Sequence, residues 1–454
     1  MKTKDFVWQF RQNRLLMFFA STLFVLFSVL QTTAQPGGCY NDTWRHEYCR
    51  EQRNALLEKY GLEIENLDRQ IAHEPNNAAN YYQRGQVYSA MMSLRVSGAR
   101  DVEFDGKVYF ADIDTKAIED YARAIQLAPK VEYFVERGKI YMSQWQRGTS
   151  NFQYVRRDEK TTDEEIRQTI DKLFIYNEDF QAAERDFLKA IELSSDYERS
   201  KTARELLFSL RSWRANSLDL NESIARLIGA GKPADIALAD LDHAIDFYRF
   251  YLANNEPNDT VKRLFYGAWI RKGVAAKRFG RDDIALDAFG EAEKVQVKNS
   301  FPDCALYHNR AEIFSKRANY EAALKDVTFA IENNPNCKRM SELRGDIYLL
   351  KGDLTAAIDS YSTILNDGNG YNRDIYWKRG KLYLETSEAQ KAISDFTAGI
   401  GSSSLCERDY ELRARAFRLA GDMQAAEADE ERARQAVKNQ KSYTGSEYCH
   451  YHKQ

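Results

Sequence analysis

The amino-acid sequence predicts an all-α protein, a superhelical stack of about nine helical hairpins that follows an N-terminal leader. Two observations support this fold class. A pattern of small and aromatic residues recurs about every 34 positions in the C-terminal half, and stacked helical hairpins have periods of this length. Only 7 prolines occur in 454 residues, of which 43% are hydrophobic, so long unbroken helices are favoured over strands.

Each repeat begins with a basic residue, a small residue and, three positions later, usually an aromatic residue. An alanine stands twelve residues after the small one, usually with a bulky residue four positions beyond it. The small residues of the last five repeats are Gly273, Ala311, Gly345, Gly380 and Ala414. Small residues let two helix axes approach closely, so each repeat is expected to form one hairpin. The expected turns lie near Arg281, Asn319, Gly352 and Ser387.

This pattern resembles the tetratricopeptide repeat, in which Gly, Tyr, Ala, Phe and Pro follow one another in a 34-residue hairpin. The resemblance extends over residues 44 to about 440. It implies a right-handed α-α superhelix that binds segments of other proteins in its concave groove, with no catalytic centre and no cofactor. The predicted divisions are a leader (1–34), a cap with a degenerate first repeat (35–77), repeats with insertions (78–260), regular repeats (261–440) and a tail (441–454).

Three insertions interrupt the N-terminal repeats. The twelve-residue step becomes 32 residues after Gly85, 45 after Gly138 and 22 after Ala215. The first insertion contains Asp105-Gly106 between β-prone runs, which predicts a small β-hairpin. The second contains Thr162 and Glu165 at capping-box spacing, which predicts a helix start, and the third is expected to be a loop up to Pro233. All three fall between the two helices of a hairpin, so they should project from one edge of the array.

The first 34 residues have the layout of a secretory signal. Basic residues precede an uncharged apolar run at 15–30, and small residues lead to a plausible cleavage site after Ala34. The protein is therefore expected to be exported, to the periplasm or outside the cell. An uncleaved membrane anchor through residues 15–30 and a lipoprotein modified at Cys39 remain as alternatives.

Export would place the six cysteines in an oxidising compartment. Cys39 and Cys49 lie close in sequence, which favours a local disulfide. Cys304, Cys337 and Cys406 fall in separate repeats, and six cysteines in a chain of this length are too few for a disulfide scaffold.

Composition and motifs exclude several classes of function. A net charge of −3 gives no electrostatic basis for binding nucleic acid. The sequence lacks a Gly-x-Ser-x-Gly motif, a phosphate-binding loop and a His-Glu-x-x-His motif. Cys449, His450 and His452 could bind a metal with His46 and Cys49, but these clusters lie at opposite ends of the array, so a solvated tail is expected and no metal site is assigned.

Two surfaces are candidates for partner binding. One is the inner face of the last four hairpins, where the candidate contacts are Trp377, Lys381, Arg415 and Arg418. The other is the inserted edge, where the candidate contacts are Tyr109, Phe110, Phe152 and Tyr154. The alternatives are an ordinary solvated helix face for the first surface and aromatic residues that cover the flank of the array for the second.

The sequence therefore predicts a non-catalytic scaffold that binds protein or peptide partners in the cell envelope or secretory compartment. One alternative is an enzyme or metal-dependent module in the insertions at 89–111 and 146–176, which contain no His or Cys. Another is an envelope protein that binds glycan or peptidoglycan through exposed aromatic residues.

Overall fold

The structure is a computed structural model, and it describes most of the chain between residues 47 and 440. The ranges not described within these limits are 95–101, 105–106, 111, 150–161, 195, 220–230, 256–257, 296–302, 335, 338–339, 367–372 and 401–406. The predicted leader, Cys39 and the tail lie outside the described residues. Of the helices that are described, none is both long and apolar enough to span a bilayer.

The chain divides into two compact units, which are described separately. Unit 1 comprises Met1–Ile284 and Glu291–Gln296, and unit 2 comprises Ala285–Gly290 and Val297–Gln454. Helix α12 (Asp282–Lys294) has residues in both units.

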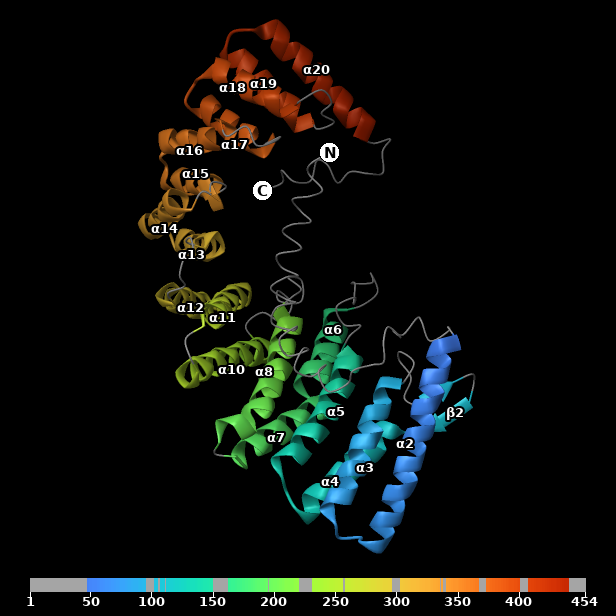
Figure 1. Cartoon of the computed structure of the whole chain (residues 1–454). Coiled ribbons are helices and arrows are strands. Elements are labelled where there is room, and N and C mark those ends of the chain that lie inside the picture. Colours follow the sequence, from blue (N-terminus) through green and yellow to red (C-terminus); the bar gives the residue numbers. More distant parts are fainter. Residues whose placement is uncertain are drawn as a thin grey trace. The chain divides into compact units, whose positions relative to one another are not determined.

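Unit 1 contains a long helix and three helical hairpins that stack in sequence order (Figure 1). Its main helices are α2 (Glu47–His73), α3 (Ala78–Met91), α4 (Ile113–Leu127), α5 (Val131–Thr149), α7 (Glu178–Glu192), α8 (Tyr197–Asp219), α10 (Lys232–Asn254) and α11 (Asp259–Arg278). The pairs α3–α4, α5–α7 and α8–α10 form the hairpins, and the second helix of each packs on the first helix of the next element.

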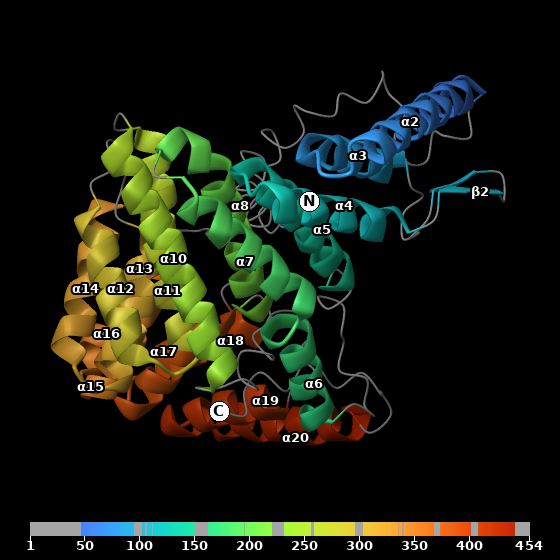
Figure 2. The ribbon, with the colours of Figure 1, turned by 90° about the horizontal axis from the view of Figure 1, so that it is seen from below.

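The degenerate first repeat predicted within residues 35–77 does not form a hairpin. This region contains α2, a single helix of 27 residues, which lies beside α3 (Figure 2). Leu57, Ile64 and Leu67 fall on one face of α2 at helical spacing and are buried in the first core cluster. The helix is followed directly by the Pro75 turn, so the capping element is one helix rather than two.

The first two insertions contain secondary structure of their own. After η1 (Met92–Leu94), β1 (Val102–Phe104) and β2 (Lys107–Phe110) pair antiparallel, with Phe104 opposite Lys107. The second insertion contains α6 (Asp163–Ile170) and the π-helical turn η3 (Asp171–Ile175). The predicted capping box at Thr162 and Glu165 is confirmed, because each residue's backbone N–H donates to the other's side chain.

After α12, the described residues of unit 2 form four regular hairpins stacked in sequence order. Its helices are α13 (Cys304–Lys316), α14 (Tyr320–Asn333), α15 (Met340–Lys351), α16 (Leu354–Asn366), α17 (Arg373–Glu385), α18 (Ala389–Ile400), α19 (Glu407–Leu419) and α20 (Met423–Gln440). The predicted turns within this unit are confirmed, and each contains a residue with positive φ: Ala318 (57°), Gly352 (85°) and Ser387 (61°). The all-α prediction of stacked hairpins is thus confirmed.

A glycine on the first helix of four hairpins lies directly against an aromatic ring on the second. A Cβ atom built on Gly345 would lie 2.5 Å from Cε1 of Tyr361, and one on Gly380 would lie 2.8 Å from Cε1 of Phe396. The corresponding distance is 2.8 Å for Gly85 and Tyr121 and 2.6 Å for Gly138 and Phe187. These rings fill the space that a side chain would need, so the small residues are required by packing.

Candidate functional site

An arginine–aspartate bridge joins the two helices of most hairpins, next to the small residue of the first helix. The arginine precedes the small residue of the first helix, and the aspartate precedes the bulky residue of the second. In Arg379–Asp395, Nε donates to Oδ2 at 2.8 Å and Nη2 donates to Oδ1 at 2.7 Å. The same two-bond arrangement occurs in Arg84–Asp120, Arg137–Asp186, Arg214–Asp240, Arg310–Asp326 and Arg413–Asp429.

The bridge aspartates are buried, and their environments affect their pKa values in opposite directions. Burial raises the pKa of Asp240, and the hydrogen bonds from Arg214 offset only part of that effect. Burial also acts to raise the pKa of Asp429, but hydrogen bonds from Arg413 and Arg432 outweigh it and hold the pKa below its usual value. The recurring basic residue is evident in the sequence, and its partner could have been found there too, because an aspartate recurs in the second helix, usually just before the bulky residue.

The α15–α16 hairpin has Ser360 in place of this aspartate, and a charged cluster lies beside it. Arg344 donates to Ser360 Oγ at 3.2 Å instead. Nearby, Tyr361 Oη donates to Asp346 Oδ1 at 2.6 Å, and Lys378 Nζ donates to Asp346 at 2.7 Å and to Glu342 at 2.9 Å. Burial acts to lower the pKa of Lys378, but these two carboxylates outweigh it and raise the pKa. This acidic cluster therefore neutralises Lys378 across α15 and α17.

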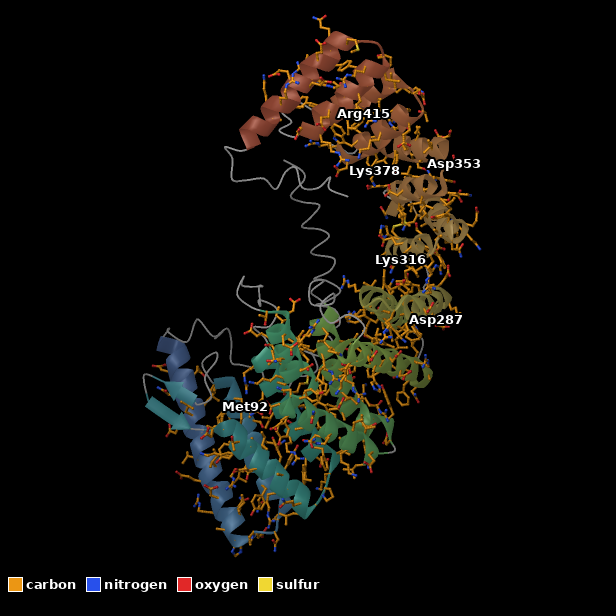
Figure 3. The ribbon with its side chains drawn as sticks, turned by 180° about the vertical axis from the view of Figure 1, so that it is seen from behind. Met92, Asp287, Lys316, Asp353, Lys378 and Arg415 are labelled. Carbon is orange, nitrogen blue, oxygen red and sulfur yellow. A yellow bond between two sulfur atoms is a disulfide. The ribbon has the colours of Figure 1, made fainter. Side chains whose placement is uncertain are left out.

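The first helices of unit 2 form its inner side, and Lys378 lies there, whereas Asp353 lies on the outer side (Figure 3). We call the exposed and half-exposed polar residues of α13, α15, α17 and α19 the first-helix face. It contains the acidic cluster on α15 and, on α17 and α19, a basic group that stands among exposed acidic residues such as Glu407 and Glu411. The basic group consists of Lys381, Arg408 and Arg415.

Lys381 and Arg415 lie on the first-helix face, and their role as partner contacts stays a prediction. Lys381 is half-buried, and burial, together with the positive charges of Arg408 and Lys378, lowers its pKa. Arg415 is exposed on α19. Among the described residues, neither Lys381 nor Arg415 has an ion-pair partner. Arg418 is also exposed, but it pairs with Glu430 of α20 and is thereby held toward the second helix.

Trp377 is a correction to the sequence analysis, which placed it in the binding groove. Only 3% of the residue is exposed, and its ring packs on Phe396 with the centroids 4.9 Å apart. The indole fits against α18 because Gly399 has no side chain, and a Cβ there would lie 3.0 Å from Trp377 Nε1. Trp377 therefore belongs to the core of its hairpin and presents no surface to a partner.

The described part of the inserted edge is folded onto unit 1. Trp145 of α5 is buried, and its Nε1 donates to the Leu173 carbonyl at 2.8 Å. Its ring also packs against Phe174 and Phe180. The side chains of Tyr109, Phe110, Phe152 and Tyr154 lie outside the described residues, so these predicted contacts stay predictions.

A disulfide in unit 2 was not predicted. Cys304, at the start of α13, is bonded to Cys337, which follows α14, with the Cα atoms 5.3 Å apart. The two cysteines are separated by 33 residues, close to one repeat, so they meet where successive hairpins stack. The predicted Cys39–Cys49 pairing lies outside the described residues, because Cys39 and the side chain of Cys49 are not described.

Among the described residues, no group of three or more His, Cys, Asp or Glu side chains could hold a metal ion. The candidate sites are thus two surfaces, the first-helix face in unit 2 and the inserted edge in unit 1.

Comparisons with known proteins agree with this architecture. Residues 308–372, which include most of α13 to α16, match the tetratricopeptide repeat family model. A search of curated proteins finds no match.

Several solved structures are similar in fold at low sequence identity. A crystal structure of MamA is 18% identical, with a TM-score of 0.34 over 38% of this chain and 97% of that one. Yeast Tom70 is 12% identical, with a TM-score of 0.32 over 80% and 76% of the two chains. A tetratricopeptide repeat protein from Parabacteroides merdae is 16% identical, with a TM-score of 0.27 over 67% and 93%. On the family match, residues 308–372 are tetratricopeptide repeats, and they lie within a longer stack of helical hairpins.

Proposed function

We propose that this protein is a non-catalytic scaffold that binds segments of partner proteins on the first-helix face of unit 2. The supporting observation is the basic group of Lys381, Arg408 and Arg415. Lys381 and Arg415 have no ion-pair partner among the described residues, while the neighbouring Lys378 is neutralised by two carboxylates. Like charges without a counter-ion destabilise a folded protein, so the retention of Lys381 and Arg415 favours a role in contacting an acidic partner segment.

The test is capture of partners by the full chain and by two matched variants. In the first variant, Lys381→Glu and Arg415→Glu reverse the basic group, and we expect the specific partners to be lost. In the control, Lys325→Glu reverses an exposed charge on the second helix α14 and should leave capture unchanged. Capture that survives the double reversal in a folded protein would contradict the proposal.

Export is part of the proposal. The N-terminal layout of the sequence supports it, and so does the Cys304–Cys337 disulfide, because stable disulfides are rare in reducing cytosol. A fractionation of cells that express the tagged full chain tests this point. Recovery of the protein in the cytosol with free thiols at Cys304 and Cys337 would refute it.

The inserted edge is a second proposed contact surface, with Tyr109, Phe110, Phe152 and Tyr154 as its contacts. The observation that favours it is that three consecutive hairpins are extended at the same turn, whereas the hairpins of unit 2 are not. Replacing 150–161 by a short turn tests it. Loss of a partner by a folded protein is the expected outcome, and unchanged capture would refute the idea.

A further inference from the structure

Unit 1 contains an open pocket where the N-terminal half of α11 meets the end of α10 and the last turn of α12. Its volume is about 470 Å³, which lies within the range of ligand-binding pockets. The residues that matter here are Arg249, Lys262, Phe265, Trp269, Glu291 and Lys294. All of them belong to unit 1.

The floor of the pocket is aromatic. Phe265 and Trp269 stand one turn apart on α11, with their ring centroids 6.3 Å apart and the rings inclined at 61°. Both residues pack at the edge of the core cluster formed by Ile245, Tyr248 and Ala268, yet both remain partly exposed. Partly exposed, well-supported aromatic side chains are typical anchors in protein interfaces.

The rim of the pocket is charged and easily rearranged. Arg249 pairs with Asp246 and Lys294 pairs with Glu291, each at 2.5 Å and each three residues apart on an exposed helix surface. Such exposed pairs contribute little to stability and can exchange for a ligand. Lys262 has no ion pair among the described residues. Three cations against two carboxylates leave a positive surplus around the aromatic floor.

We propose that this pocket binds a segment of a partner protein in which a large apolar side chain is flanked by Asp or Glu. The apolar side chain packs on Phe265 and Trp269, and a neighbouring carboxylate contacts Lys262 and Lys294. The positive rim favours this chemistry over a basic segment, and the apolar floor favours it over a purely acidic one. The site is separate from the first-helix face of unit 2, so it adds a second binding position to the proposed scaffold.

The test measures binding of three synthetic peptides to the full chain by isothermal titration calorimetry. The first peptide has a central Leu-Phe pair flanked by glutamates, the second has lysines in place of the glutamates, and the third has serines in place of Leu-Phe. We expect the first to bind at least roughly ten-fold more tightly than the others, a difference of about 1.4 kcal/mol. Equal or undetectable binding of all three overturns the proposal.

Two variants locate the site. Lys262→Glu, a substitution at the rim, should weaken binding of the first peptide by roughly ten-fold or more. Phe265→Ala, a substitution at the floor, should weaken it by a similar factor. If circular dichroism shows that Phe265→Ala unfolds the protein, Lys262→Glu decides the question alone. Binding unchanged by Lys262→Glu overturns the proposal. The Lys381→Glu, Arg415→Glu double variant should leave peptide binding intact, which separates this site from the first-helix face.

Discussion

The interrupted hairpins of unit 1 and the regular hairpins of unit 2 share one contact layer despite very different connections. Arg137 and Asp186 are 49 residues apart, and Arg379 and Asp395 are 16 apart, yet both pairs make the same two hydrogen bonds at 2.7–2.8 Å. The glycine–aromatic contacts beside these two bridges are similarly close, since a Cβ atom would lie 2.6 Å from Phe187 at Gly138 and 2.8 Å from Phe396 at Gly380. In these two hairpins, the bridge and the glycine–aromatic contact beside it hold the two helices together. The connection between the helices can therefore lengthen without disturbing their packing.

The units differ in how successive hairpins are joined. In unit 2, the Cys304–Cys337 disulfide links the start of α13 to the segment that leads into α15. The described residues of unit 1 contain no disulfide. Unit 1 instead gains contacts from its second insertion, in which Phe174 is fully buried against Trp145.

The largest expected effect comes from removing the disulfide. Closing a loop of 33 residues is worth about 3–4 kcal/mol in the chain-entropy description. The Cys304→Ser, Cys337→Ser variant should therefore lose about this much stability. Hydrogen exchange measured by mass spectrometry should show faster exchange in α13 to α15 and no change in α3 to α5. Reduction of the disulfide in the parent protein should produce the same change in hydrogen exchange. Equally faster exchange in both units would contradict the expected difference between them.

The next effect concerns the bridges. Asp186→Ala and Asp395→Ala each leave a largely buried arginine without its carboxylate, and each should cost about 3 kcal/mol in urea unfolding. The control, Glu192→Gln, removes an exposed pair with Lys189 and should cost less than about 1 kcal/mol. Similar losses at Asp186 and Asp395 would support the shared contact layer. A negligible loss at Asp186 alone would show that the insertion has taken over that role.

A smaller effect is expected at the glycines. Gly138→Leu and Gly345→Leu place a side chain where an aromatic ring already lies, so each should cost about 1–3 kcal/mol through overpacking. Gly290, also within a helix, has open space where its Cβ would be, and Gly290→Ala should leave stability unchanged or raise it by up to about 1 kcal/mol. Thermal unfolding measures all three. Parent-like unfolding of Gly138→Leu would show that the interrupted hairpin is more loosely packed.

The sequence was sufficient to predict the hairpins, because small and aromatic residues must recur wherever two helices approach closely. It misled at Trp377, because the matching positions His308, Glu342 and Glu411 remain at least partly exposed in the other hairpins. In the α17–α18 hairpin, Gly399 on α18 has no side chain, and this leaves room for the indole of Trp377. The burial of Trp377 therefore depends on the combination of Trp377 and Gly399, which lie on two helices, and cannot be predicted from either position alone.

The Cys304–Cys337 disulfide and the single capping helix α2 were not predicted from the sequence, for different reasons. Cys304 and Cys337 fall in separate repeats of the sequence, which favours no pairing by itself, but a spacing of about one repeat is what brings neighbouring hairpins into contact. The span from 44 to 77 has the length of a repeat but lacks the small residue of a first helix, and α2 accordingly continues without a turn. In both cases the repeat period is evident in the sequence, but the period alone does not say which residues meet in space or whether a repeat folds as one helix or two.

The smallest effect is on pH dependence, and it distinguishes a bridge of unit 1 from one of unit 2. Asp429 has a lowered pKa because two arginines bind it. Its contribution to stability is therefore present above the pKa of an unfolded aspartate and is lost as the pH falls through the lowered folded value.

Asp240 has one bridging arginine, and burial raises its pKa, so its contribution has the opposite sign. It is present at pH values below the unfolded pKa and declines as the pH rises through the raised folded value. Titration of both carboxyl groups by NMR in the full chain should place Asp240 above and Asp429 below the ordinary aspartate value. Arg432→Gln should raise the pKa of Asp429 and leave that of Asp240 unchanged, because it removes the second arginine that separates the two sites. An unchanged pKa of Asp429 in that variant would contradict this account.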